Sequence, residues 1–600
     1  MLERARGVLR FWKVTQPKHS RDGLCHFPYP TKVGYRDLAK FGKKGGDMKK
    51  YTAIEPLEPR IAPATISIVG KTATWTDHDG DLVTMKWTSA DAPTFTTMDR
   101  GAGLLVSTVL LDAAKHDGAS FTVKVKAAGA FGDGRVELGH VNGNGVSLKS
   151  WIGPKAAIAE VDLGKHDDVG TGTFISGGIG QTKTSDFIGS MGNGQSTLFG
   201  DSKVVKINGD LGYTSLTIGT ITQIGATLGT VTITGSLRGD LPSSMSLNGT
   251  LFIVGSGKSL FIGGSVLDGE IVHQAGEFKK FTVAGDLIGN TPGNFVSGRV
   301  SAKAEQVTIL GSILGGQLAT SPPSKANSQV ITVGGSLVAQ DGVQESGVIA
   351  VFGSAKSVTV KGSIRGAEFA SWSTSDIFPI HSAGAIDVKG SVGSINVGGS
   401  IHAGKVANGD PAVNGGIYVR EKVSTINIGG GIYGRENAPV YLLARGNVTG
   451  ATADYNAIGK LSIKKDTINA FIAAGTYMSP PFFDNDPLVL ITDKPDAGIG
   501  SIFIGGNFVN SNVFAGVDDG GSPGVNNAAI NDTLAVGDPA LTAKLGPVVI
   551  KGHLLSDRAS AYFSGFAADV IASITVNGRK VFTAGDGLRN FDTFITAREL

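Results

Sequence analysis

Apolar and polar residues alternate in a short phrase that returns along most of the chain. The clearest copy is residues 231–237, Val-Thr-Ile-Thr-Gly-Ser-Leu, and close copies occupy residues 281–287, 307–313 and 331–337. Alternation with a period of two predicts a β-strand whose valine and isoleucine face a core while the threonines face outward. A unit that recurs every few tens of residues indicates a repeat architecture.

The spacing of the phrase predicts how the chain coils. From residue 204 to about residue 430 the phrase recurs about every 21–31 residues, with one close pair at Gly390 and Gly399. The interval then grows to about 35–46 residues before a last one of about 26. The glycine after each strand predicts a corner with positive φ, and the aliphatic residue two positions later can point back into the core. Strand, corner, strand and loop together predict one turn of a parallel β-solenoid.

The expected fold class is all-β: a parallel β-solenoid preceded by a small antiparallel β unit. Residues 65–135 contain short alternating segments and an Asp-Gly step, which is typical of a hairpin. Residues 136–430 are predicted to form the regular solenoid, and residues 431–600 an irregular solenoid with long loops. Insertions in a solenoid emerge on its surface, so any ligand contact is expected at the loops of residues 479–495 and 518–539.

Asp77, Asp79 and Asp81 lie together in the hairpin turn of the antiparallel unit, in the sequence Asp-His-Asp-Gly-Asp. Clustered carboxylates are typical ligands of calcium, but an EF-hand loop starting at Asp77 would need glycine at its sixth position and glutamate at its twelfth. Leu82 and Thr88 stand there instead. Two interpretations stay open: a solvated hairpin turn, which is the simpler one, and a calcium site of another geometry. The three aspartates are the candidate metal ligands, and no catalytic or cofactor-binding residue is predicted.

The first 64 residues differ from the rest of the chain. Residues 1–47 are basic, lack the apolar core of a secretory signal and precede a second methionine, Met48. They are predicted to be an upstream extension that is not part of the mature protein, with a genuine basic arm as the alternative. Residues 48–64 hold a Leu-Glu-Pro-Arg motif at residues 57–60, within a linker that its prolines bias away from helix.

This Leu-Glu-Pro-Arg motif resembles the N-terminal signature of large surface or exported proteins of planctomycete and verrucomicrobial bacteria, which continue into glycine-rich β-repeats. The resemblance covers residues 54–64. It implies export to the cell surface or the extracellular space, and it implies no particular reaction. The chain departs from the pattern in lacking a hydrophobic segment near the motif, which leaves the export route open.

Charge and composition argue against several classes of function. The 600 residues carry a formal net charge of +3, but residues 1–50 hold 13 of the 54 Lys/Arg and only 4 of the 51 Asp/Glu, so the remainder is mildly acidic. The remainder has no basic stripe that would predict nucleic-acid binding. The sequence has no apolar run long enough to predict a membrane span. The single cysteine, Cys25, excludes an internal disulfide and a cysteine-based zinc site.

A solenoid enzyme that cuts acidic polysaccharides, either a lyase or a glycoside hydrolase, is the main alternative function. Such an enzyme needs convergent carboxylates at equivalent positions of neighbouring coils. The small polar residues are instead expected to fit a tight corner and to bond local backbone. Two serine-bearing coils separate the two aspartates of the row, so the row does not predict a catalytic pair. The residues after the corner glycines are Asp210, Ser236, Ser265, Asp286, Ser312, Ser336, Ser363 and Ser391.

The sequence therefore predicts a non-enzymatic structural or adhesive protein, either extracellular or at the cell surface. Its expected partners are polysaccharides or other surface components, with neither nucleic acid nor a membrane span. No cofactor is predicted, except for calcium if the three aspartates bind it.

Overall fold

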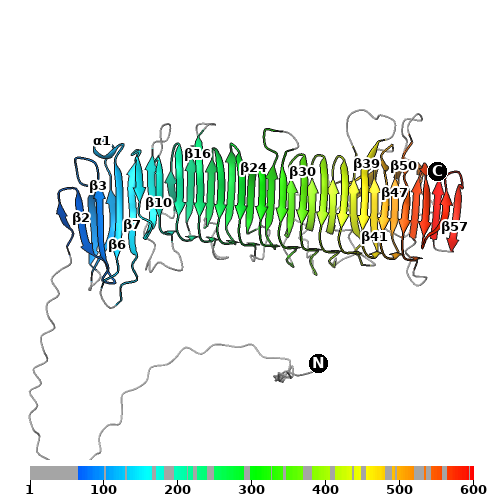
Figure 1. Cartoon of the computed structure of the whole chain (residues 1–600), viewed down its shortest axis with the longest axis horizontal. Coiled ribbons are helices and arrows are strands. Elements are labelled where there is room, and N and C mark those ends of the chain that lie inside the picture. Colours follow the sequence, from blue (N-terminus) through cyan, green and yellow to red (C-terminus); the bar gives the residue numbers. More distant parts are fainter. Residues whose placement is uncertain are drawn as a thin grey trace, which may run out of the picture. The chain divides into compact units, whose positions relative to one another are not determined.

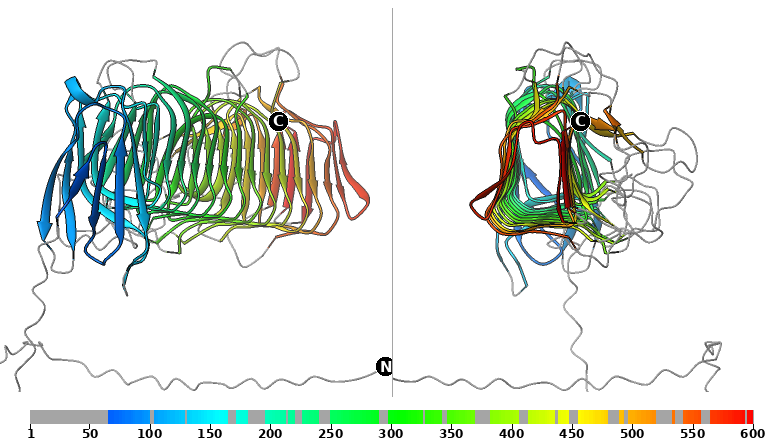
Figure 2. Two further views of the ribbon diagram at one scale, coloured as in Figure 1. Left: turned by 60° about the vertical axis from the view of Figure 1, so that its left-hand side comes forward. Right: turned by 90° about the vertical axis from the view of Figure 1, so that its right-hand side faces the viewer.

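Each coil of the chain is built from three strands and the corners between them. In the coil that carries the clearest copy of the phrase, these are β16 (Thr227–Ile233), β17 (Leu237–Arg238) and β18 (Thr250–Val254). All three pair in parallel with the equivalent strands of the next coil, and Val231 lies opposite Leu260. Figure 2 shows the stacked coils from the side and along their axis. The predicted parallel β-solenoid is confirmed, but a third strand occupies part of each predicted loop.

Equivalent strands stack into three faces along the solenoid. Figure 1 shows the coils following one another in sequence order from the N-terminal to the C-terminal end of the stack. Strand β24 (Arg299–Ile309) bends across two of them, since its first half continues the third face and its second half opens the next coil on the first face. The other strands of the first face are β10 (Thr173–Ser176), β13 (Ser202–Ile207), β19 (Ser256–Ile262), β22 (Phe278–Val283), β27 (Val330–Val333), β30 (Ala355–Val360), β33 (Val392–Val397), β36 (Val423–Ile428), β39 (Asn456–Ile463), β44 (Gly498–Ile499), β45 (Ile502–Ile504), β50 (Lys544–Leu545), β51 (Val548–Ile550), β54 (Val570–Ile571) and β55 (Ser573–Val576).

The second face consists of strands of two residues, and the third face of longer ones. The other second-face strands are β11 (Ile179–Gly180), β14 (Leu211–Gly212), β20 (Val266–Leu267), β23 (Leu287–Ile288), β25 (Ile313–Leu314), β28 (Leu337–Val338), β31 (Ile364–Arg365), β34 (Ile401–His402), β37 (Ile432–Tyr433), β40 (Thr467–Ile468), β46 (Phe508–Val509) and β52 (Leu554–Leu555). The other third-face strands are β12 (Gln195–Leu198), β15 (Ser215–Gly219), β21 (Glu270–Ala275), β26 (Gln317–Ser321), β29 (Val348–Val351), β32 (Ser382–Val388), β35 (Val413–Val419), β38 (Val440–Ala444), β41 (Ala470–Ala474), β47 (Asn512–Ala515), β53 (Ser564–Ala568) and β58 (Ile595–Glu599).

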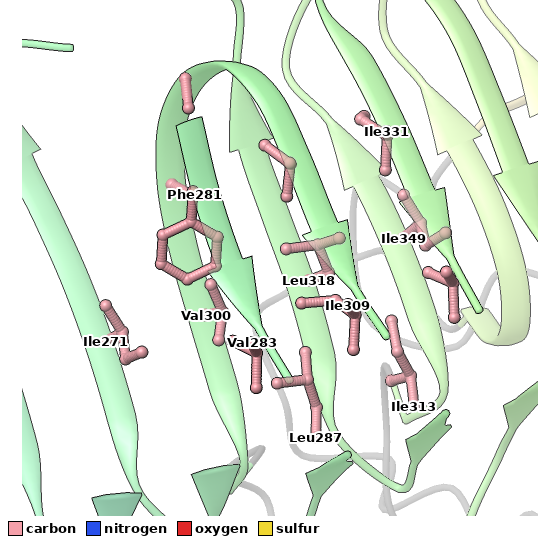
Figure 3. Close-up of a cluster of buried hydrophobic side chains, with 14 of the residues drawn as sticks. Ile271, Phe281, Val283, Leu287, Val300, Ile309, Ile313, Leu318, Ile331 and Ile349 are labelled. Carbon is pink, nitrogen blue, oxygen red and sulfur yellow. The ribbon is translucent and has the colours of Figure 1, made fainter. Parts of the chain in front are cut away.

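The side chains that point inward from the three faces form one continuous core. In one coil, Phe281 and Val283 come from the first face, Leu287 from the second and Val300 from the third (Figure 3), and all four are buried. Each coil places such side chains in register with those of its neighbours, so stacking buries surface that a single coil would expose. The column of paired inward positions on the first face is Phe121, Trp151, Phe174, Val205, Val231, Leu260, Phe281, Val307, Ile331, Val358, Ile395, Ile426, Leu461, Ile502, Val548 and Ile574.

The small polar residues after the first-face strands form a row that we call the corner ladder. The side chain of each acceptor in this row accepts a hydrogen bond from the backbone N–H of the ladder residue in the next coil. The prediction that these side chains bond local backbone is therefore wrong. The successive acceptor–donor pairs are Asp210–Ser236 (2.8 Å), Ser236–Ser265 (3.2 Å), Ser265–Asp286 (3.0 Å), Asp286–Ser312 (2.6 Å), Ser312–Ser336 (3.1 Å), Ser336–Ser363 (3.0 Å), Ser363–Ser400 (3.1 Å) and Ser400–Gly431 (3.1 Å), and beyond them Asp466–Asn507 (2.7 Å) and Asn507–His553 (2.9 Å).

The glycines before the ladder residues are needed for space and not for a positive φ. The prediction of left-handed corners is wrong here, because the φ of Gly235, Gly335 and Gly362 lies outside the left-handed region. A Cβ on Gly335 would lie 2.1 Å from the Ser312 hydroxyl, and one on Gly362 would lie 2.2 Å from the Ser336 hydroxyl. The coils therefore approach each other so closely at this corner that only glycine fits.

The close pair of glycines at residues 390 and 399 marks two different corners of the solenoid. Gly390 follows β32 on the third face, whereas Gly399 follows β33 on the first face. The inclusion of Ser391 in the serine row is therefore wrong. Its N–H bonds the Ser354 hydroxyl at 3.0 Å, at the equivalent corner of the preceding coil, and Ser400 takes the position in the ladder.

Antiparallel strands close the N-terminal end of the stack. The first face continues through β6, β3, β2 and β1, each antiparallel to the one before it. Strand β4 lies antiparallel to β5. Parallel pairing begins where β6 meets β8 and β5 meets β7, and the core runs through this region without a break. The elements are β1 (Ser67–Val69), β2 (Thr72–Thr76), β3 (Leu82–Trp87), β4 (Thr94–Asp99), β5 (Leu104–Leu110), α1 (Ala113–His116), β6 (Ser120–Lys126), β7 (Val136–Asn144), β8 (Ser150–Ile152) and β9 (Ala156–Gly164).

Antiparallel strands also close the other end. Strand β55 pairs with β56 (Arg579–Thr583), and β58 pairs with β57 (Leu588–Asp592), both antiparallel. The long loops predicted after residue 430 contain two short hairpins. These are β42 (Thr476–Ser479) with β43 (Val489–Thr492), and β48 (Val517–Asp518) with β49 (Thr533–Leu534).

Residues from Ile61 onward belong to one structural unit. Within the residues that are described, no helix is long and apolar enough to cross a membrane. The predicted basic leader, 1–47, and the Leu-Glu-Pro-Arg segment, 48–64, lie outside the described residues. The computed structural model describes residues 65–99, 103–128, 131–164, 171–180, 195–212, 214–219, 226–239, 249–289, 297–325, 328–341, 346–368, 382–405, 413–435, 438–446, 455–479, 489–492, 496–518, 533–534, 542–556, 564–592 and 595–599.

Candidate functional site

The three predicted metal ligands come together at the turn between β2 and β3. Figure 1 shows these two strands at the N-terminal end of the stack. Asp77 continues the alternation of β2, so it lies on the same side as the buried Trp75, and Asp81 lies on the same side as the buried Val83. Only 1% of Asp77 and 0% of Asp81 is exposed, while Asp79 is half-buried. The interpretation of this cluster as a solvated turn is therefore wrong for two of the three aspartates.

Hydrogen bonds from backbone N–H groups hold the cluster in place. Asp81 accepts from Ala128 at 2.9 Å through one carboxylate oxygen and from Gly134 through the other. Asp79 accepts from the N–H of Asp133 at 3.2 Å, and Asp77 accepts from the N–H of Asp81 at 2.7 Å. The hairpin turn is thus tied to the segment around residues 128–134, which lies about 50 residues further along the chain.

The pKa values of the cluster reflect this burial. Burial raises the pKa of Asp77 to about 8, and the nearby carboxylates of Asp79 and Asp81 act in the same direction. The pKa of Asp79 is lowered instead. Burial acts against that shift, but the neighbouring Asp77 carboxyl and the backbone N–H groups of Asp133 and Asp81 outweigh it. Opposite pKa shifts are expected for two neighbouring carboxyl groups that lie too close together for both to be charged.

A second cluster was missed by the sequence analysis. His140 on β7 and Glu160 and Asp162 on β9 each place a ligand atom within 4.8 Å of the others. The two strands are parallel neighbours, with His140 opposite Glu160. The Nε2 atom of His140 lies 2.9 Å from Asp162, whose second oxygen accepts from the Thr197 hydroxyl at 2.5 Å. His140 and Asp162 are 22 residues apart, about one coil, and that spacing is the signal that could have predicted their contact.

This second cluster behaves as an ion pair on the outer surface. The hydrogen bond with Asp162 raises the pKa of His140, against the effect of burial. Burial acts to raise the pKa of Asp162, but His140 and Thr197 outweigh it, so its pKa is lowered. The side chains of both residues are 25% exposed. A charge pair at such a position links two coils, and pairs of this kind contribute modestly to stability.

The two aspartates of the corner ladder are also engaged in hydrogen bonds. Asp210 accepts from the N–H of Ser236 at 2.8 Å and from Nε of Arg238 at 2.8 Å. Asp286 accepts from the N–H of Ser312 at 2.6 Å. Both carboxylates thus connect consecutive coils, in the same way as the serines of the ladder.

An apolar patch lies on the outside of the third face in the coils after residue 430, the part of the chain whose long loops were expected to contact a ligand. Its aromatic members, Tyr441, Phe471 and Phe514, alternate along their strands with inward core residues. Tyr441 and Phe471 lie 5.8 Å apart, and Phe471 and Phe514 lie 5.2 Å apart, measured between ring centroids. These rings are buried, and strand β42 packs beside β38. The remainder of these loops, including residues 480–488 and most of 519–541, lies outside the described residues.

No family model, no curated protein and no solved structure matches the chain.

Proposed function

We propose that the protein is a non-enzymatic, exported or cell-surface rod with a structural and adhesive role. One observation carries this proposal. The repeated polar positions of the solenoid, where an enzyme of this fold would be expected to align its carboxylates, are occupied by the corner ladder, whose side chains bond the next coil. A regular row of such bonds supports a role that depends on length and rigidity.

The location and the partners are proposed on separate grounds. The Leu-Glu-Pro-Arg motif resembles that of exported bacterial surface proteins with β-repeats, and this resemblance supports export. The solenoid part of the chain is mildly acidic, and this supports partners other than nucleic acid. Polysaccharides and other surface components are the proposed partners, with the long loops after residue 430 as the contact region.

Incubation of the full chain with a panel of acidic and neutral polysaccharides tests the proposal. Binding is measured by co-sedimentation, and cleavage by the release of reducing ends and of unsaturated ends that absorb in the ultraviolet. We expect binding to at least one member of the panel, without release of either kind of end. Time-dependent release of ends, at a rate proportional to protein concentration, would favour a lyase or glycoside hydrolase and contradict the proposal.

A further inference from the structure

A carboxylate oxygen without a hydrogen-bond donor is buried at the turn between β2 and β3. No donor among the described residues bonds Oδ2 of Asp77, and the neighbouring Asp79 carboxylate can share a hydrogen bond with Asp77 only while one of the two carries a proton. The Asp77 side chain points to the core side of its hairpin. A buried charged oxygen without a partner is strongly unfavourable, so it needs either a proton or a positive ion. The described residues place no arginine or lysine in a salt bridge with any of the three aspartates.

The donor set around this oxygen is suited to a hard cation. Asp77, Asp79 and Asp81 each offer a carboxylate oxygen, and these three oxygens lie within 4.8 Å of one another. Oxygen-only sites select calcium or magnesium, whereas zinc is bound mainly by nitrogen and sulfur. Calcium accepts six to eight ligands in irregular geometry, while magnesium requires a near-ideal octahedron. Three carboxylates from one tight turn fit calcium better.

The carboxylates are already oriented before any ion arrives. Backbone N–H groups of Ala128 and Gly134 each hold one oxygen of Asp81, and the N–H of Asp133 holds Asp79. Each carboxylate oxygen has two lone pairs, so an oxygen that accepts one such bond can still coordinate an ion. A site whose ligands are held by a second set of bonds loses little freedom on binding.

We propose that Asp77, Asp79 and Asp81 form a calcium site that fixes the β2–β3 turn to the segment around residues 128–134. The ion occupies the place next to Oδ2 of Asp77 that no protein donor fills. It compensates the charge of the three carboxylates and stabilises the N-terminal end of the solenoid. This site does not depend on the proposed surface role, and it is tested separately from it.

Isothermal titration of the chelator-treated full chain with Ca²⁺ tests this site. We expect a binding event near one ion per chain with a Kd of about 10⁻³ M or tighter, and weaker binding of Mg²⁺. Unfolding followed by tryptophan fluorescence reports on the same region, because Trp75, Trp87 and Trp151, three of the five tryptophans, are buried there. Calcium is expected to raise the midpoint of this transition.

Two variants and a matched control locate the ion. Asp77→Asn and Asp79→Asn each remove one charged ligand, and each is expected to weaken calcium binding at least tenfold and to reduce the midpoint shift. Asp286→Asn makes the same substitution in the corner ladder and is expected to bind calcium as the unaltered chain does. Circular dichroism establishes that each variant is folded. The proposal is overturned if the unaltered chain shows neither heat nor midpoint shift with Ca²⁺, if Mg²⁺ binds as tightly, or if both cluster variants retain full binding.

Discussion

At the scale of single residues, the corner ladder explains why glycine and serine recur at the same positions. The glycine allows two coils to approach, since a Cβ at Gly335 would meet the Ser312 hydroxyl at 2.1 Å. The following serine then uses this closeness, because Ser336 accepts the N–H of Ser363 one coil further on. The residue type at each of these two positions is determined by contact with the neighbouring coil, and not by the conformation of its own turn.

The Ser336→Ala variant tests the contribution of one ladder bond. The substitution leaves the N–H of Ser363 without its acceptor, and we expect the free energy of unfolding to fall by about 1 kcal/mol. Ser357→Ala is the matched control, since Ser357 lies half-buried on the next coil, the one that carries Ser363, but outside the ladder. It should change the free energy by less than about 0.5 kcal/mol. Equal losses in the two variants, measured by denaturant unfolding, would contradict the role given to the ladder.

His273 is expected to make the solenoid less stable in acid. Its ring lies at a bulge of the third face, where Nε2 is 3.0 Å from the carbonyl of Gly255 and Nδ1 accepts the N–H of Lys303 at 3.3 Å. Both bonds suit the neutral ring, and burial lowers the pKa of His273. The positive charge of Lys303 acts in the same direction, and Glu277 is the nearby carboxylate.

The sign of the pH dependence follows from this lowered pKa. The unfolded chain takes up the proton first, at a pKa of about 6.5, so the stability contributed by the neutral ring is complete above that pH. It is lost as the pH falls from there through the lowered pKa of the folded state. The free energy of unfolding of His273→Gln should therefore decrease less between pH 7.5 and pH 5 than that of the unaltered chain. Identical decreases would show that His273 does not titrate in this way.

At the scale of elements, Asp81 connects a hairpin turn to a distant segment. Asp81→Ala removes the acceptors of the Ala128 and Gly134 N–H groups, so hydrogen exchange at these two amides should speed up about tenfold. Asp79→Ala is the control. It removes the bonds from the N–H groups of Asp133 and Asp81, neither of which involves Ala128 or Gly134, and should leave the exchange of those two amides unchanged. Equal exchange at Ala128 and Gly134 in Asp81→Ala and the unaltered chain would contradict this connection.

Some elements of the fold could be predicted from the sequence, and others could not. The two-residue alternation and its spacing predict the first strand, the corner and the return of Leu237 to the core, because each depends on local pattern. The third strand was missed, since its sequence, as in residues 250–254, carries a weaker alternation and follows a stretch of variable length. The positive φ assigned to the corner glycines is wrong for a related reason. The sequence of one coil does not show where the neighbouring coil comes into contact with it.

The same limit applies to the candidate sites. The sequence predicts the Asp77, Asp79 and Asp81 cluster because the three residues lie within one turn, but it does not show their burial, which depends on the distant residues 128–134. The contact between His140 and Asp162 depends on the pairing of β7 with β9. Only a known register places two residues one coil apart beside each other.

At the scale of the whole solenoid, both ends of the stack are edges that could pair with another chain. The outermost strand of the first face at the C-terminal end is β56, which begins with the exposed Arg579 and Lys580. Charged side chains on an edge strand oppose pairing between molecules. These two residues are therefore expected to keep the end of the stack monomeric.

A double substitution, Arg579→Thr with Lys580→Val, tests this protection. We expect association that increases with concentration, measured by light scattering coupled to size-exclusion chromatography. The matched control is Lys279→Thr with Lys280→Val, which removes two exposed lysines from β22, a strand paired on both sides. The control should elute as the unaltered chain does. Association of both variants to the same extent would mean that lost charge, and not the edge, causes it.

Fractionation of the native cells tests most directly the proposal that the solenoid is an exported or surface rod. An antibody against the purified chain would be used to follow the protein through cytoplasmic, envelope and culture-medium fractions, with a cytoplasmic enzyme as a marker of lysis. We expect the protein in the envelope or the medium while the marker stays in the cytoplasm. Recovery of the protein together with the marker in the soluble cytoplasm would contradict it.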